Sequence, residues 1–293
     1  MLKFEQRQQN RAEVILAFPT HLSTKVGQSS VEVIGRGYVG SLIARMTNAA
    51  NLTSLTGTPA SVSEPRIAII ASGPSSVDTS VIDLEEWKSK LTTWVRKFGH
   101  RYEHIIYISS AGTVYGEARL NAAIETDQLK PVSDYGEYHK TVEQHLLDAS
   151  RFDATIVRLT NIYGPSQLTK KKQGFISAVV RAAKSQAPLT IFGDGENVRD
   201  YIHENDVIDA LKLILKKPEP GIFNLSSGYR YSLNDIISSV EQLWGRRLSV
   251  RRRPSRFCDL TNVNVSNEKL KRLYGWTPRY SLKSGIESYR QVI

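Results

Sequence analysis

Three glycines at a fixed spacing carry the strongest chemical signal in the sequence. Gly35, Gly37 and Gly40 stand in GRGYVG, directly after the short apolar run VEVI and before SLIARM, whose apolar residues have helical spacing. Between a strand and a helix, the first glycine makes a tight turn, the second lets the backbone approach a pyrophosphate, and the third allows close helix–strand packing. The pattern therefore predicts a dinucleotide site at 35–40, with the phosphates at the helix N-terminus.

The carboxylate that would accompany such a turn is missing. An acidic residue that binds ribose is expected about 20 residues after the glycines, yet the sequence from Asn48 to Ser63 contains no Asp, Glu, Lys or Arg. The interval between Gly40 and the next apolar run, RIAIIASG, is also short. We therefore expect that one strand–helix unit has been trimmed, and the choice between NAD and NADP stays open.

The elements that must position this turn follow an alternating order. Apolar runs at 66–73, 104–110 and 154–165 alternate with helical stretches at 83–98 and from about residue 133. Alternation of this kind is typical of a parallel sheet that helices cover on both faces. The sequence therefore predicts an α/β fold.

The last third of the chain continues with shorter elements. A helix is expected in GFISAVVRAAK, a strand in APLTIFGDG, and a loop in RDYIH that leads into a helix capped by Asp206. Ser232 is the expected cap of the following helix, in SLNDIISSVEQLWG. The apolar run at 12–20 could be an extra strand or part of a tail.

The composition narrows the classes of protein that fit. The 293 residues are 40% hydrophobic and 23% charged, as in ordinary globular proteins and unlike disordered or fibrous ones. No run approaches the roughly 20 apolar residues of a membrane span, and the polar start does not resemble a signal peptide. Cys258 is the single cysteine, so we expect neither an intramolecular disulfide nor a metal site. The expectation is a cytoplasmic, metal-free protein without membrane contact.

The charge balance indicates an anionic partner. The formal net charge is +10 and the isoelectric point about 9.6. Basic residues cluster at 170–172, 216–217, 246–247 and 251–256. Because aromatic residues are sparse around these clusters and no nucleic-acid-binding motif is present, nucleic acid is an unlikely partner. Phosphorylated small molecules fit the charge better.

Seven motifs, in sequence, resemble those of one family. They are GRGYVG (35–40), ISSAGTVYG (108–116), YGEYHKTVEQ (135–144), VRLTNIYGP (157–165), IFGDGENVRDYIH (191–203), IFNLSSG (222–228), and RFCD followed by LYGWTP. Together they resemble the extended short-chain dehydrogenase/reductase family, in particular its NAD-dependent nucleotide-sugar epimerase/dehydratase group of the UDP-glucose 4-epimerase type. The resemblance covers the chain from about residue 31 to its end.

The resemblance implies a fold and two kinds of ligand. It implies a Rossmann-type, doubly wound parallel sheet that binds NAD or NADP, and a smaller α/β carboxy-terminal domain that binds a nucleotide-diphosphate sugar. The expected boundaries are an amino-terminal extension at 1–30, the dinucleotide domain at 31–165 with 200–226 returning to it, and the sugar-nucleotide domain at 166–199 and 227–293.

The resemblance also implies a homodimer. Members of the family pair through the helix corresponding to 83–98 together with the helix that follows Ser133. The stripe of Trp87, Leu91 and Trp94 is compatible with that interface, although packing in the core explains the stripe equally well.

The family's chemistry implies a tyrosine base and a nearby lysine. Tyr135 matches the tyrosine that takes a proton from a sugar hydroxyl, but the lysine four residues later is replaced by His139. Lys140 is five residues from Tyr135, about 140° around a helix, so it should not face the same cofactor. A neutral imidazole lowers a tyrosine pKa less than a buried cation does. His139 is therefore expected to be an imperfect replacement, able to bind ribose or relay a proton.

The hydroxyl that assists the tyrosine is also displaced. The family's Ser or Thr falls on Ala111, which leaves Ser110 and Thr113 as candidates. Alternation along a strand would point Ser110 away from the Ala111 side, and Thr113 shares that side only if the backbone stays extended.

The remaining positions implied by the resemblance are better preserved. Further cofactor contacts fall on four residues of the glycine turn and the following strand end, namely Tyr38, Val39, Ala71 and Ser72. On the sugar-nucleotide side, Asn161 matches a residue near the diphosphate-sugar, Arg199 and Arg256 match nucleotide-binding arginines, and Asp259 matches a ribose-binding acid.

Three functions follow from these residues. The leading interpretation is an NAD(P)-dependent nucleotide-sugar epimerase that oxidises the sugar transiently and returns the hydride to its other face. A keto-sugar nucleotide reductase would use the same residues with net consumption of NAD(P)H. The replacements at Ala111 and His139 also fit a non-catalytic relative that binds NAD or a nucleotide sugar. Dehydration and decarboxylation are disfavoured, because the acidic residues that the family uses for them are absent.

Overall fold

The computed structural model describes residues 31–48, 52–59, 67–74, 79–117, 121–168, 174–256 and 259–292. The apolar run at 12–20, the lysines at 170–172 and Cys258 lie outside the described residues, so the expectations for them remain predictions.

A six-stranded parallel sheet forms the centre of the larger part of the fold, with the strand order β2–β1–β3–β4–β5–β9. The strands are β1 (Val31–Ile34), β2 (Leu52–Thr53), β3 (Ile67–Ile70), β4 (His104–Ser110), β5 (Asp153–Leu159) and β9 (Gly221–Leu225). All four residues of β3 are buried, which explains why this strand is a continuous apolar run and does not alternate. The predicted doubly wound α/β architecture is confirmed.

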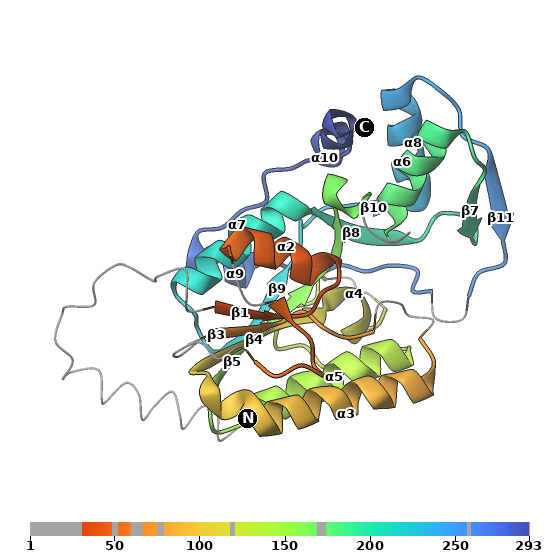
Figure 1. The fold of residues 1–293 in the computed structure, drawn as a ribbon. Coiled ribbons are helices and arrows are strands. Elements are labelled where there is room, and N and C mark those ends of the chain that lie inside the picture. The colour runs from red at the N-terminus through yellow and green to blue at the C-terminus, as the bar shows by residue number, and fades with distance from the viewer. Residues whose placement is uncertain are drawn as a thin grey trace.

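Helices cover both faces of this sheet (Figure 1). On one face lie α3 (Val81–Phe98) and α5 (Asp134–Leu147), and on the other α2 (Tyr38–Thr47), α7 (Glu204–Lys216) and α9 (Glu268–Tyr274). Leu91 and Trp94 of α3 are almost completely buried against the sheet, and Trp87 packs against the same cluster. The aromatic stripe therefore belongs to the core and supplies no support for a subunit interface.

A smaller part of the fold contains most of the last third of the chain. It combines the three-stranded sheet β10–β8–β6 with the two-stranded sheet β11–β7. The elements are β6 (Asn161–Tyr163), α6 (Phe175–Ser185), β7 (Leu189–Phe192), β8 (Val198–His203), β10 (Arg230–Ser232), α8 (Leu233–Trp244), β11 (Val250–Arg253) and α10 (Leu282–Glu287). Short helical turns complete the chain at α4 (Ala111–Val114), η2 (Gly99–Arg101), η3 (Pro165–Gln167) and η4 (Ser288–Gln291).

The helix caps agree with the sequence in most places. Ser133 caps α5, and Ser232 caps α8 in a full capping box with Asp235. The expectation for RDYIH was wrong, because residues 198–203 form strand β8 and His203, not Asp206, caps α7. The Asp206 carboxylate instead accepts hydrogen bonds from the backbone of the carboxy-terminal segment.

One buried carboxylate joins β8 to two neighbouring segments. The Asp200 side chain, 1% exposed, accepts hydrogen bonds from Thr160 Oγ1 (2.6 Å), from Ser227 N and Oγ (2.9 Å each) and from Gly228 N (2.8 Å). Burial raises the pKa of Asp200 to about 6, although these hydrogen bonds act in the opposite direction. The folded protein therefore binds a proton here at a pH where the unfolded chain has released it.

We expect Asp200→Asn to remove a pH dependence of stability. Because the folded pKa lies above the unfolded value, the contribution of Asp200 is complete below pH 4 and is lost as the pH rises through about 6. Between pH 4 and 7 the unmodified protein should lose about 3 kcal/mol relative to the variant. Urea unfolding at four pH values measures this difference, and parallel curves for the two proteins would contradict it.

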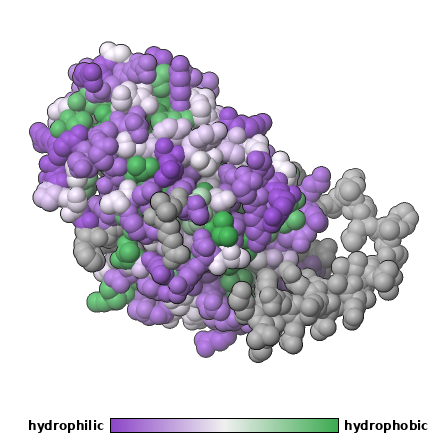
Figure 2. All heavy atoms as spheres, turned by 180° about the vertical axis from the view of Figure 1, so that it is seen from behind, coloured by the Kyte–Doolittle hydropathy of each residue, from purple (hydrophilic) through white to green (hydrophobic). Residues whose placement is uncertain are grey.

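The surface is mainly polar. In Figure 2 the apolar groups on the face shown are small and separate. The three arginines of β11 are exposed. No helix in the described ranges is long and apolar enough to cross a membrane. Those ranges also contain no group of three or more His, Cys, Asp or Glu residues that could hold a metal ion.

Candidate active site

The predicted site residues gather where parallel strands end. The glycine turn follows β1, Ala71 and Ser72 follow β3, and Ser110 is the last residue of β4. Because neighbouring parallel strands end at the same edge of a sheet, these three connections lie together, which is the usual place for a ligand in an open α/β sheet.

The glycine turn has the geometry of a phosphate cradle. Gly35 has φ +136°, and a Cβ there would lie 2.1 Å from the carbonyl oxygen of Ala71, so the position requires glycine. A Cβ on Gly40 would lie 2.0 Å from the Gly35 oxygen, so only glycine allows this close approach of helix and turn. A Cβ on Gly37 would meet no atom within 4 Å, which leaves the space before the turn open.

Helix α2 begins at this open space. No side chain caps its first turn, so its leading N–H groups and the positive end of its dipole can receive an anion. The Tyr38 hydroxyl donates a 2.6 Å hydrogen bond to Glu204, and Val39 packs in the core between α2 and the sheet. These two predicted contacts therefore hold the turn with their side chains, and only their backbone is available to a cofactor. The turn fits a dinucleotide pyrophosphate.

Tyr135 and His139 lie side by side on α5. Their rings meet edge to face with centroids 4.6 Å apart, as expected for residues one helical turn apart. Burial raises the pKa of the Tyr135 hydroxyl to about 12, and the nearby Ser110 side chain acts against that rise. Burial lowers the pKa of His139 to about 3, so the imidazole is neutral at physiological pH. Among the described residues, no cation therefore favours the Tyr135 phenolate.

The sequence did not reveal the residue that holds His139. Tyr107, on β4, forms a 2.7 Å hydrogen bond with His139 Nδ1, and His139 is 5% exposed. The Nε2 atom of His139 is buried and has no hydrogen-bond partner within the described ranges, as expected for an atom that a ligand would complete. The only signal for Tyr107 in the sequence was a hydroxyl in the otherwise apolar run HIIYI.

A second tyrosine, Tyr138, connects this cluster to the connection after β3. Its ring lies 5.2 Å from that of His139, and a Cβ on Gly73 would lie 3.3 Å from its hydroxyl oxygen. The loop that touches Gly35 through Ala71 thus also touches the tyrosine helix through Gly73. The glycine turn and the helix that carries Tyr135 are therefore joined through this loop.

Of the two candidate hydroxyls, that of Ser110 lies beside Tyr135. The condition for Thr113 is not met, because β4 ends at Ser110 and α4 begins at Ala111, so the backbone does not stay extended as far as Thr113. Ser110 consequently reaches Tyr135, whereas Thr113 Oγ1 donates to the Ser110 carbonyl oxygen at 3.3 Å. Lys140 forms an exposed 3.2 Å ion pair with Glu137, in agreement with the helical geometry that separates it from Tyr135.

The substrate-side residues form two groups. Arg256 and Asp259 form an ion pair, with Nη2 and Oδ1 2.7 Å apart. The negative charge of Asp259 also acts to raise the pKa of Arg199. Arg199 donates to the backbone carbonyls of Val198 and Leu260. The structure thus brings the three charged residues together. Asn161, on the neighbouring strand β6, donates through its Nδ2 to the Asp200 carbonyl oxygen at 2.9 Å.

A buried ion pair joins helix α5, which carries Tyr135, to the central sheet. Arg158 of β5 and Glu143 of α5 are 3% and 2% exposed, and Arg158 Nη2 lies 2.7 Å from Glu143 Oε2. Glu143 also accepts from Ser109 at 2.5 Å, and Arg158 donates to the Tyr115 hydroxyl at 2.8 Å. Ser109 precedes Ser110, so the network connects both sides of the candidate catalytic pair.

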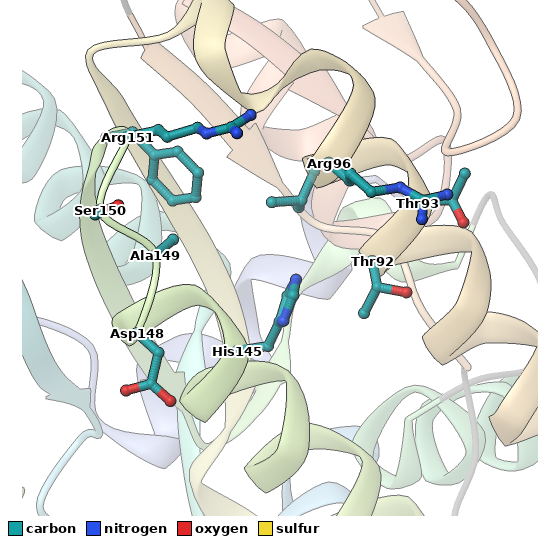
Figure 3. Close-up of a pocket in the computed structure, with 10 residues that line it drawn as sticks. Thr92, Thr93, Arg96, His145, Asp148, Ala149, Ser150 and Arg151 are labelled. Atoms are coloured by element: carbon teal, nitrogen blue, oxygen red, sulfur yellow. The ribbon is translucent and has the colours of Figure 1, made fainter.

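A sizeable cavity lies elsewhere in the structure. Its volume is about 530 Å³, and it opens between the carboxy-terminal parts of α3 and α5, with Arg96, His145 and Arg151 around it (Figure 3). None of the predicted cofactor, catalytic or substrate residues lines it. It is therefore separate from the candidate active site.

Comparison with known proteins agrees with the fold and the motifs. The chain matches the model of the NAD dependent epimerase/dehydratase family over residues 67–226, more than half of its length, and belongs to this family. The family's reactions are those of enzymes that act on sugar nucleotides.

Individual relatives are distant. A Methanocaldococcus jannaschii protein, provisionally named a UDP-glucose 4-epimerase, is 30% identical over 63% of this chain and 61% of its own length. The dTDP-4-dehydro-6-deoxyglucose reductase of Escherichia coli is 28% identical over 63% of this chain and 60% of its own length. The alignments thus span about three fifths of these relatives. The Thermus thermophilus UDP-glucose 4-epimerase in complex with NAD has the same fold, with a TM-score of 0.76, 22% identity, and coverage of 90% of this chain and 99% of that one.

Proposed function

We propose that this chain is a nicotinamide-dinucleotide-dependent nucleotide-sugar epimerase with an unusually weak catalytic base. One observation carries the proposal. Tyr135 lies beside Ser110 and His139 at the sheet edge where the glycine turn opens. The loop after β3 contacts both that turn and helix α5, which carries Tyr135. Family membership and the epimerases among the relatives support it.

In this proposal the residues of the chain handle protons and position the ligands. The bound dinucleotide would supply reversible hydride acceptance at the sugar carbon. Tyr135 would take the proton from the sugar hydroxyl and later return it, and Ser110, beside Tyr135, would form a hydrogen bond with the same sugar hydroxyl. His139, fixed by Tyr107, would present Nε2 toward the cofactor. Arg199 and Arg256 would bind the nucleotide diphosphate, and Asp259 would accept hydrogen bonds from the ribose of the nucleotide.

The test is interconversion of UDP-glucose and UDP-galactose by the full chain, with NAD or NADP supplied, followed by NMR. We expect slow epimerisation that Tyr135→Phe reduces by at least about 100-fold, since general acid–base catalysis contributes on the order of 10²–10⁴-fold. Tyr274→Phe is a matched control, because Tyr274 ends α9, away from the site, and its hydroxyl donates to the carbonyl oxygen of Lys217 just after α7. Equal rates for the Tyr135 and Tyr274 variants would contradict the proposal.

Two other functions are favoured by particular observations. The Escherichia coli relative is a reductase, and a reductase would consume NAD(P)H in proportion to a keto-sugar product, whereas an epimerase consumes none. The neutral His139 and the alanine at position 111 favour a non-catalytic sugar-nucleotide-binding protein, which would bind the ligands and convert none of them. The homodimer and the cytoplasmic location stay predictions, and sedimentation velocity tests the former.

A further inference from the structure

Among the residues that the structure describes, no acid that would recognise NAD lies at the ribose end of the proposed dinucleotide site. Residues 54–59, which directly follow β2, are Ser-Leu-Thr-Gly-Thr-Pro. Within the same described residues, Glu32 of β1 is a nearby carboxylate, but it is completely buried and accepts hydrogen bonds from Thr53 (3.1 Å) and Tyr102 (2.8 Å). Its carboxylate is therefore used within the core and cannot receive a ribose hydroxyl.

An arginine lies beside β2, in the region where the ribose-binding acid is expected. Arg36 lies between Gly35 and Gly37, is exposed, and its Nη2 lies 3.4 Å from the carbonyl oxygen of Leu52 in β2. The guanidinium thus extends from the glycine turn across the edge strand. In the part of the chain that the structure describes, no carboxylate pairs with Arg36, so its charge is available to a ligand.

Hydroxyl donors accompany this arginine. Ser54 is the first residue after β2, and its Oγ lies 3.0 Å from Thr56 Oγ1 in a turn closed by the Gly57 N–H to Ser54 oxygen bond of 2.9 Å. A guanidinium and two hydroxyls offer hydrogen-bond donors to a phosphate, whereas the ribose hydroxyls of NAD would find no carboxylate acceptor. In dinucleotide-binding folds, an acid in this region accompanies NAD and an arginine accommodates a 2′-phosphate.

We propose that this site prefers a dinucleotide with a phosphate on the 2′ position of its adenosine ribose, and that Arg36 binds this phosphate with help from Ser54 and Thr56. The inference rests on the proposed dinucleotide site and adds which cofactor it takes. The family's description names NAD, so a preference for NADP differs from that description.

Direct binding of NADP⁺ and NAD⁺ to the full chain, by isothermal titration calorimetry without any sugar, tests the proposal. We expect NADP⁺ to bind at least about 10-fold more tightly, and Arg36→Met to weaken NADP⁺ binding by about 10- to 100-fold, since a hydrogen bond to a charged group contributes this much. Binding of NAD⁺ should change less than about threefold. The preference should weaken as salt is added.

Two further variants sharpen the result. Arg45→Met removes the same charge from an exposed position in the last turn of α2 and should leave both affinities unchanged. Ser54→Asp adds the missing carboxylate and should reverse the preference toward NAD⁺. Equal affinities of the unmodified chain for the two dinucleotides, or an Arg36→Met variant that loses both equally, would overturn the inference.

Failure of this inference is distinguishable from failure of the proposed activity. If the chain prefers NADP⁺ through Arg36 but epimerises no sugar nucleotide, the inference is supported and only the proposed activity is contradicted. Absence of binding of either dinucleotide overturns both.

Discussion

His139→Lys should raise epimerase activity at pH 7 by about 10- to 1,000-fold. In the unmodified chain the Tyr135 pKa of about 12 leaves roughly one phenolate in 10⁵ at neutral pH. An ammonium group within about 6 Å favours an ionised neighbour and lowers its pKa by about 1–3 units. The ring of His139 already lies 4.6 Å from that of Tyr135, so a lysine at this position would reach the phenol.

The pH profile distinguishes this explanation from a general improvement in folding. Activity of the unmodified chain should rise about tenfold per pH unit between 7 and 9, because the phenolate fraction does, and the profile of the lysine variant should level off at lower pH. His139 itself is neutral throughout this range. The control is His139→Gln, which is neutral and can still bond the Tyr107 hydroxyl. A gain of equal size in the glutamine variant would contradict the electrostatic explanation.

Arg158→Met should destabilise the protein by about 3–5 kcal/mol, because it leaves the Glu143 carboxylate buried without its cation. The two side chains are almost completely buried, and Glu143 would keep only the Ser109 hydroxyl of the partners described above. Urea unfolding, followed by circular dichroism, measures the loss. We expect epimerase activity to fall as well, since the network joins α5 to the end of β4.

Two comparisons make this prediction specific. The double variant Arg158→Met with Glu143→Leu should recover much of the loss, since replacing a buried ion pair by apolar side chains is often neutral. Lys140→Met breaks the exposed pair with Glu137 and should cost less than about 1 kcal/mol. If Arg158→Met costs no more than Lys140→Met, the buried pair does not stabilise the fold as described.

Local sequence patterns were sufficient to predict the part of the fold that contains the six-stranded sheet. The buried apolar strands, the glycine turn and the serine caps of α5 and α8 depend on residues close together in sequence, so the sequence predicted them correctly. The same holds for Lys140, which helical geometry alone excluded from the site. The sequence predicts a loop at 199–203, where the structure has a strand, because β6 and β10, the strand partners of β8, are distant in sequence.

The chemistry of the site depended on contacts that no spacing reveals. The sequence by itself predicted a dinucleotide turn at 35–40, placed Tyr135 beside His139, and showed that the lysine, the serine and the ribose acid expected from the resemblance are replaced. Only the tertiary structure decided that Ser110 reaches Tyr135, because the chain bends where β4 ends, and that Tyr107 holds His139 in a buried position. Burial and hydrogen bonding between segments set the protonation of Tyr135 and His139, and both arise when distant strands and helices pack together.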